Sequence, residues 1–180
     1  MCSDNDIKIA GDKPSLDILK NSQKNSEETA ISKKQAEAAR LWGEAVALRF
    51  INDVKNSEVG EKDSDLEMLA QRRILLSFTA SVGFEKLCSN DTLGGLAQKS
   101  FLDTLRKKDP KHYITPEDTG AFSFYYLAFR RGNDVERRIG QTFAMLCSHD
   151  GDPIYQELGE ALYCWFLSVV KEYAEQFNIV

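Results

Sequence analysis

Apolar residues recur every three or four positions along most of the chain after residue 26, which is the spacing of helices with one buried face. Leu41, Trp42, Ala45 and Leu48 show this pattern within the first such stretch, over residues 27–56. Further helices are predicted over 64–88 and 91–108, and from about residues 116, 134 and 153 onward. No stretch alternates apolar and polar residues over the length of a strand. The pattern therefore predicts an all-α bundle of five or six helices with short connections.

Several helix starts carry local capping signals. Ser64 and Glu67 form a capping box, in which each side chain accepts a hydrogen bond from the other residue's main-chain amide. Thr115-Pro116 and Asp152-Pro153 each place a capping side chain before a proline at the first helical position. These signals support the predicted starts of the second, fourth and sixth helices.

The first 26 residues differ from the remainder of the chain. Polar residues dominate them, and Gly11 and Pro14 interrupt the few apolar positions. Such a segment cannot bury enough apolar surface to order itself. We therefore expect a flexible tail over residues 1–26 and a single helical domain over residues 27–180.

Composition narrows the range of functions. A formal net charge of −5 opposes non-specific binding to nucleic acid, which requires basic side chains that neutralise phosphates. No apolar run is long enough to cross a bilayer, and the amino terminus does not resemble a secretory signal. Without paired cysteine motifs, Cys2, Cys88, Cys147 and Cys164 are interpreted as reduced thiols, the last three in apolar helical surroundings. We expect a cytoplasmic protein with no membrane partner.

The segment over residues 121–138 is the most distinctive part of the chain. A dense aromatic helix runs into two arginine pairs that flank a Gly132-Asn133-Asp134 turn. We expect this helix to be the enclosed, central helix of the bundle. Guanidinium groups suit oxyanions, so the arginines could bind an anionic small ligand beside the tyrosines; alternatively, they are ordinary surface charges. The candidate binding residues are Arg130, Arg131, Arg137, Arg138, Tyr125 and Tyr126.

The remaining residues provide no catalytic or cofactor motif. His149, beside Cys147 and Asp150, has ligand types that zinc prefers, but the spacing of a zinc site is missing. The apolar neighbours of the cysteines disfavour a reactive thiolate. We therefore predict no metal, no cofactor and no catalytic residue.

Two patterns leave open an action on nucleic acid. Arg106 and His112 are spaced in a way that is similar to the R-x4-6-H pattern of the all-helical HEPN ribonucleases, although Pro110 lies between them and only two residues match. Residues 79–108 read as helix, turn and helix, as in a helix-turn-helix regulator. The acidic charge of the chain argues against both.

Taken together, these patterns predict a non-catalytic helical interaction or regulatory module that self-associates or binds a protein partner. Surplus apolar surface on the fourth and sixth predicted helices favours contact with a second copy. One alternative is a helical binding protein or enzyme that holds a small or phosphate-bearing ligand through the arginines. The other is a protein that acts on nucleic acid.

Overall fold

The computed structural model describes residues 31–59, 66–113 and 120–180, and these residues form an all-α fold without strands. Six α-helices and one short 3₁₀ helix follow one another along this part of the chain. The predicted all-α class is therefore confirmed. The elements are α2 (Lys33–Val59), α3 (Leu66–Leu87), α4 (Asp91–Lys108), η1 (Pro110–His112), α5 (Ala121–Arg130), α6 (Val135–Leu146) and α7 (Pro153–Gln176).

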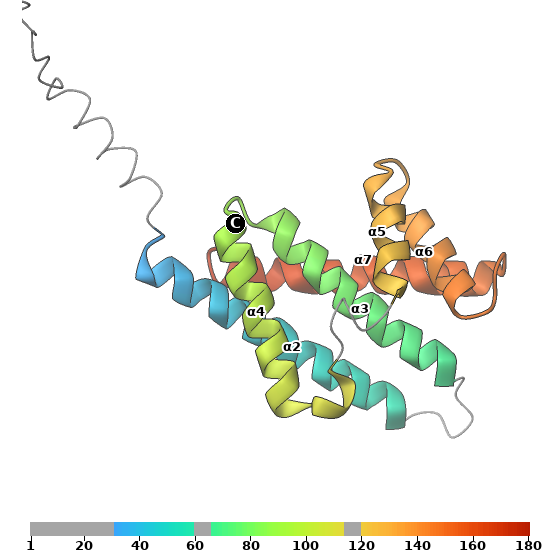
Figure 1. Cartoon of the computed structure of the whole chain (residues 1–180), viewed down its shortest axis with the longest axis horizontal. Helices are drawn as coiled ribbons and strands as arrows, with labels where there is room; N and C mark the ends of the chain where they lie inside the picture. Colours follow the sequence, from blue (N-terminus) through green and yellow to red (C-terminus); the bar gives the residue numbers. More distant parts are fainter. Residues whose placement is uncertain (1–30, 60–65, 114–119) are drawn as a thin grey trace, which may run out of the picture. The chain divides into compact units, whose positions relative to one another are not determined.

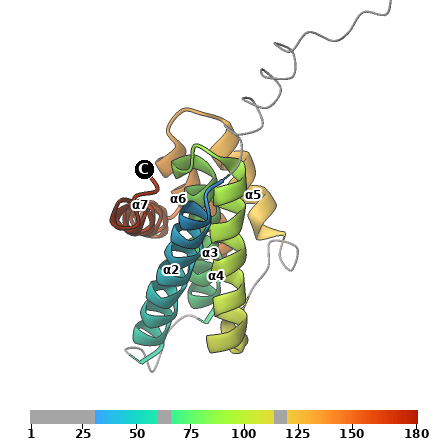
Figure 2. The same ribbon diagram turned by 90° about the vertical axis from the view of Figure 1, so that its left-hand side faces the viewer.

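Helix α3 is the centre of the fold, because it contacts each of the other α-helices. Helix α2 packs along α4, while α6 packs on α7 (Figures 1 and 2). Helix α5 contacts only α6 and α3 extensively, and it lies at the edge of the bundle in Figure 1. The expectation that the aromatic helix is the central one is therefore wrong; α3 has that place.

The core joins helices that are distant in sequence. Trp42 of α2 is fully buried, and its ring meets Phe84 of α3 edge to face, with centroids 4.8 Å apart. Phe101 of α4 packs against Phe84 and against Phe50 of α2, at centroid distances of 5.8 and 5.9 Å. Edge-to-face pairs are the favoured geometry of buried aromatic rings. One aromatic cluster thus ties α2, α3 and α4 together.

Two glycines allow the closest helix pairs to meet. A side chain at Gly43 of α2 would collide with the main-chain oxygen of Ala97 in α4. A side chain at Gly140 of α6 would collide with the main-chain oxygen of Gln156 in α7. The tight α2–α4 and α6–α7 contacts therefore depend on residues without a Cβ atom.

Apart from the starts of α2 and α5, the described helix starts agree with the sequence-based prediction. The Asp152 carboxylate accepts a hydrogen bond of 2.9 Å from the amide of Ile154, and Pro153 opens α7, as predicted. The Ser64 cap and the Thr115-Pro116 cap lie outside the described residues, as does the predicted tail. Helix α2 was expected to begin at residue 27. It begins at Lys33, and Ile31 and Ser32 before it are not helical.

The aromatic helix α5 is also less enclosed than expected. Its Phe122 and Tyr125 side chains pack on Phe78 of α3. Phe124 and Leu127, on other faces of α5, are 49% and 60% exposed. Helices α6 and α3 make the main contacts with this short helix, and these two side chains are left open to solvent.

Candidate functional site

Helices α5 and α6 form a hairpin closed by a tight turn. Gly132 and Asp134 adopt positive φ angles of 79° and 52°, which reverse the chain within a few residues. The main-chain oxygen of Asp134 then accepts a hydrogen bond of 3.0 Å from the amide of Arg138, in the first turn of α6. The turn therefore places the end of α5 beside the start of α6.

A surface hollow of about 330 Å³ lies along this hairpin. Arg131 at the end of α5 and Arg138 in α6 line the hollow, together with Asp150 from the loop after α6. Exposed apolar side chains lie among these charges. We call the surface formed by Phe124, Leu127, Arg131, Arg138, Met145 and Asp150 the α5–α6 face.

The charges of the α5–α6 face are not neutralised within the described fold. Neither Arg131 nor Arg138 forms an ion pair with a described residue, and the same holds for Asp150. Phe124, Leu127 and Met145 are 49%, 60% and 40% exposed. The hollow thus combines exposed apolar side chains with charges of both signs that remain available to another molecule.

The other two arginines of the sequence-based site lie apart from this hollow. The guanidinium of Arg130 lies over the ring of Tyr126, 5.9 Å from its centroid, in a cation–π arrangement. Arg137 is exposed on α6 and does not line the hollow. The structure therefore brings together one arginine from each pair, Arg131 and Arg138.

The two tyrosines occupy different environments. Tyr125 is fully buried and stacks on Phe78, with centroids 5.3 Å apart. Burial strongly raises the pKa of its phenol, whose hydroxyl has no hydrogen-bond partner among the described residues. Tyr126 is half-buried; burial raises its phenol pKa, Glu85 adds to this increase and Arg130 opposes it. Only Tyr126 is placed to contact a ligand at the surface.

Sequence reasoning missed four members of the α5–α6 face: Phe124, Leu127, Met145 and Asp150. A signal for two of them was present, because α5 has apolar residues on every side and a short helix with few neighbours cannot bury them all. Met145 and Asp150 carry no such signal. Their role depends on how the α5–α6 hairpin folds back.

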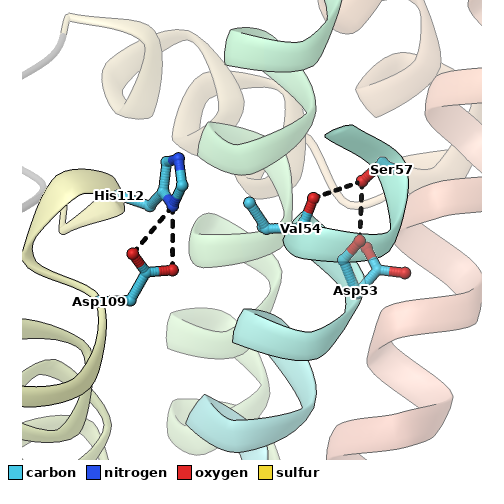
Figure 3. Close-up of polar contacts among 5 residues, drawn as sticks. All are labelled: Asp53, Val54, Ser57, Asp109 and His112. Carbon is cyan, nitrogen blue, oxygen red and sulfur yellow. Dashed lines mark hydrogen bonds and ion pairs between the residues drawn. The ribbon is translucent and has the colours of Figure 1, made fainter. Parts of the chain in front are cut away.

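Arg106 and His112 do not form one open site. The imidazole Nδ1 of His112 lies 3.0 and 2.9 Å from the two carboxylate oxygens of Asp109, and His112 is 5% exposed. Figure 3 shows the side chains of this pair pointing toward each other. The guanidinium of Arg106 instead donates to Asp103, 2.7 Å away at the surface. This geometry does not favour RNA cleavage by the two residues.

The helix-turn-helix interpretation meets a similar obstacle. Helices α3 and α4 do join through a short turn, where Asn90 caps α4 by accepting a hydrogen bond of 2.9 Å from the amide of Thr92. However, Ala97 and Phe101 of α4 are buried, and the Ser100 hydroxyl donates to the main-chain oxygen of Arg40, 2.8 Å away in α2. Much of the proposed recognition helix therefore packs inside the bundle.

The thiols and His149 show no metal-binding arrangement. The described residues contain no cluster of three or more His, Cys, Asp or Glu side chains suited to a metal ion. His149 stacks on Tyr155, with ring centroids 3.8 Å apart. Cys88 and Cys147 are buried free thiols, whereas Cys164 is exposed, which corrects its expected apolar setting. Partial burial, then Glu136 and Glu160, raise the pKa of the Cys164 thiol.

Comparison of the chain with protein-family models, with curated proteins and with solved structures finds no match. Within the described residues, every helix is too short or too polar to traverse a bilayer. The function of the chain must therefore be inferred from the chemistry of its surface.

Proposed function

We propose that this protein is a non-catalytic helical interaction module that self-associates through the α5–α6 face. The observation that supports this proposal most strongly is the exposure of Phe124, Leu127 and Met145 around one hollow. Contiguous exposed apolar side chains with a charged rim mark protein-binding surfaces. Aromatic, methionine and arginine residues are also the types enriched at such interfaces.

The charges on this face favour a second copy of the chain as the partner. A two-fold interface brings the same surface of two molecules together, so it must be complementary to itself. Arg131 and Arg138 provide positive charge, while Asp150 provides negative charge in the same hollow. Across a two-fold axis, the arginines of each copy can meet the aspartate of the other. A purely basic face would instead suit an acidic partner.

We further propose that the module acts in the cytoplasm. Cys88 and Cys147 are buried free thiols, and the described residues contain no disulfide. Free thiols persist in reducing compartments, whereas secreted proteins commonly pair them. The expected regulatory role would follow from assembly, since a change in the concentration of the chain would change the fraction that is paired.

An oxyanion ligand is the second candidate, supported by Arg131 and Arg138 lining one hollow. Guanidinium groups bind phosphate and carboxylate well. The Asp150 carboxylate in the same hollow would repel an anion, which is why we prefer the self-associating role. A thermal-shift titration with inorganic phosphate and ATP separates the two, because a bound ligand raises the melting temperature.

Replacing Leu127 with aspartate tests the proposed interface. Leu127 is 60% exposed, so Leu127→Asp should fold normally and yet place a charge in the apolar centre of the contact. Sedimentation equilibrium over a wide concentration range should show a monomer–dimer equilibrium for the wild type. The Leu127→Asp variant should remain monomeric, because the dimer would have to bury an unpaired charge.

Leu48→Asp is the matched control. Leu48 lies on α2, away from the α5–α6 face, and it is 42% exposed, close to the value for Met145. This variant should associate like the wild type. Monomeric wild-type protein at the highest concentration would refute the proposal, as would equal weakening by the two substitutions.

A further inference from the structure

A second concave surface lies between α3, α4 and α5, apart from the α5–α6 face. It encloses about 390 Å³, a volume within the range of small-ligand pockets, about 300–1,000 Å³. Residues one turn apart on α3 and on α4 form its walls, and Tyr126 of α5 closes one side. We call it the α3–α4 cleft; its polar lining is Ser81, Glu85, Asp91, Gln98 and Tyr126.

The glycine pair near the start of α4 opens this cleft. Gly94 is needed for packing, because a Cβ atom there would lie 2.8 Å from the main-chain oxygen of Phe84. A Cβ atom at Gly95 would meet nothing within 4 Å, and Gly95 has no positive φ angle. Glycine inside a helix costs about 1 kcal/mol relative to alanine. Neither packing nor backbone geometry explains why residue 95 is a glycine. Because Gly95 lines the cleft, the absence of a side chain there keeps the cleft open.

The polar groups of the cleft are predominantly hydrogen-bond acceptors. Neither Glu85 nor Asp91 forms an ion pair with a described residue. The Gln98 side-chain oxygen is shielded from solvent and has no hydrogen-bond partner among the described residues. Asp91 also stabilises the first turn of α4, which gives it a structural role. Glu85 is therefore the stronger indication of a ligand.

The aromatic lining complements these acceptors. The half-buried ring of Tyr126 borders the cleft and provides apolar surface for an alkyl chain, whereas the Phe84 ring is buried in the core. Lys86 and Arg130, the nearby cations on α3 and α5, lie over the rings of Phe129 and Tyr126 and do not line the cleft. The cleft is therefore acidic and part aromatic, a setting that suits a positively charged group.

From these features we propose that the α3–α4 cleft binds an alkyl-ammonium or alkyl-guanidinium group. Glu85 and Asp91 accept from its charged nitrogen atoms, and Tyr126 covers the alkyl chain. Such a group could belong to a free amine or to a lysine or arginine side chain of another protein. The inference does not depend on self-association, because the α5–α6 face shares none of these residues.

Calorimetric titration with agmatine, which has both charged groups, tests the inference on the full chain. Hydrogen bonds to charged groups contribute about 1.5–3 kcal/mol, so Glu85→Gln should weaken agmatine binding about tenfold or more. Gly95→Leu should fill the cleft and abolish binding, whereas Gly95→Ala should leave it largely open. Glu157→Gln, an exposed acid on α7, is the control for net charge.

The source of the group is distinguished by a second titration with acetyl-Gly-Arg-Gly-amide. Binding of agmatine but not of the peptide would indicate a free amine, whereas binding of the peptide would indicate a protein side chain. Either result supports the proposed cleft if the Gly95→Leu substitution abolishes the binding. Absence of binding by both probes would overturn the inference. Undiminished binding in folded Gly95→Leu protein would also overturn it, since the ligand would then lie elsewhere.

Discussion

The indole Nε1 of Trp42 in α2 donates a hydrogen bond of 2.9 Å to the main-chain oxygen of Val170 in α7. This bond joins two helices that are 128 residues apart in sequence. The indole is fully buried and also contacts Phe84 of α3. One side chain thus connects three helices of the core.

Replacing this side chain should weaken the whole fold. Trp42→Phe removes the hydrogen bond and leaves a small cavity, so we expect the free energy of unfolding to fall by about 2 kcal/mol. Urea denaturation followed by circular dichroism measures the change. Trp165→Phe, at a half-buried position of α7, should cost less than half as much. Equal losses would contradict the central role of Trp42.

Tyr125→Phe should stabilise the protein. The Tyr125 hydroxyl is buried without a hydrogen-bond partner among the described residues, and an unsatisfied buried polar group costs about 1–3 kcal/mol. Phenylalanine keeps the stacking on Phe78 and removes that cost. We expect the free energy of unfolding to rise by about 1 kcal/mol in urea denaturation. A loss of stability would mean that the hydroxyl has a favourable contact.

The stability of the fold should decline in alkaline solution through Tyr163. Burial, with a smaller contribution from Glu136, raises the pKa of this phenol from 10.0 to about 12. Below pH 10.0 the Tyr163 phenol keeps its proton in both the folded and the unfolded chain, so the full contribution of Tyr163 to the stability of the fold is present. Between pH 10.0 and about 12 the unfolded chain binds fewer protons than the folded chain, so stability falls as pH rises.

Tyr163→Phe tests this pH dependence. Urea midpoints measured between pH 9 and 11.5 should decline less steeply for Tyr163→Phe than for the wild type. Other buried phenols, Tyr125 among them, will leave part of the slope. Identical slopes for the two proteins would show that Tyr163 ionises as readily in the folded chain as in the unfolded chain.

The sequence predicts a helix end reliably where neighbouring residues alone determine that end. Asp152 and Pro153 fix the start of α7 through one capping hydrogen bond, and the basic end of α4 lies where the apolar spacing stops. The position of α5 at the edge of the bundle could not be predicted in this way. Aromatic density predicts burial, but burial also requires neighbours, and the short α5 packs mainly against α6 and α3.

In the candidate site, too, the sequence identifies residues but not their arrangement in the fold. Arg131 and Arg138 are visible in the sequence as members of two pairs, yet which arginine of each pair enters the hollow depends on the turn at Gly132 and Asp134. Asp150 joins them only because the loop after α6 passes the same surface. The self-complementary charge pattern is therefore a property of the folded hairpin.

Reversal of these charges tests the proposed symmetric contact most directly. The double variant Arg131→Glu and Arg138→Glu makes the hollow wholly acidic, and Asp150→Lys makes it wholly basic. Sedimentation equilibrium should find that each variant alone associates more weakly than the wild type, because like charges then face each other across the two-fold axis. Mixed in equal amounts at low salt, the two variants should form a heterodimer. If the mixture associates no better than its components, or if each variant alone dimerises like the wild type, self-association through the α5–α6 face is contradicted.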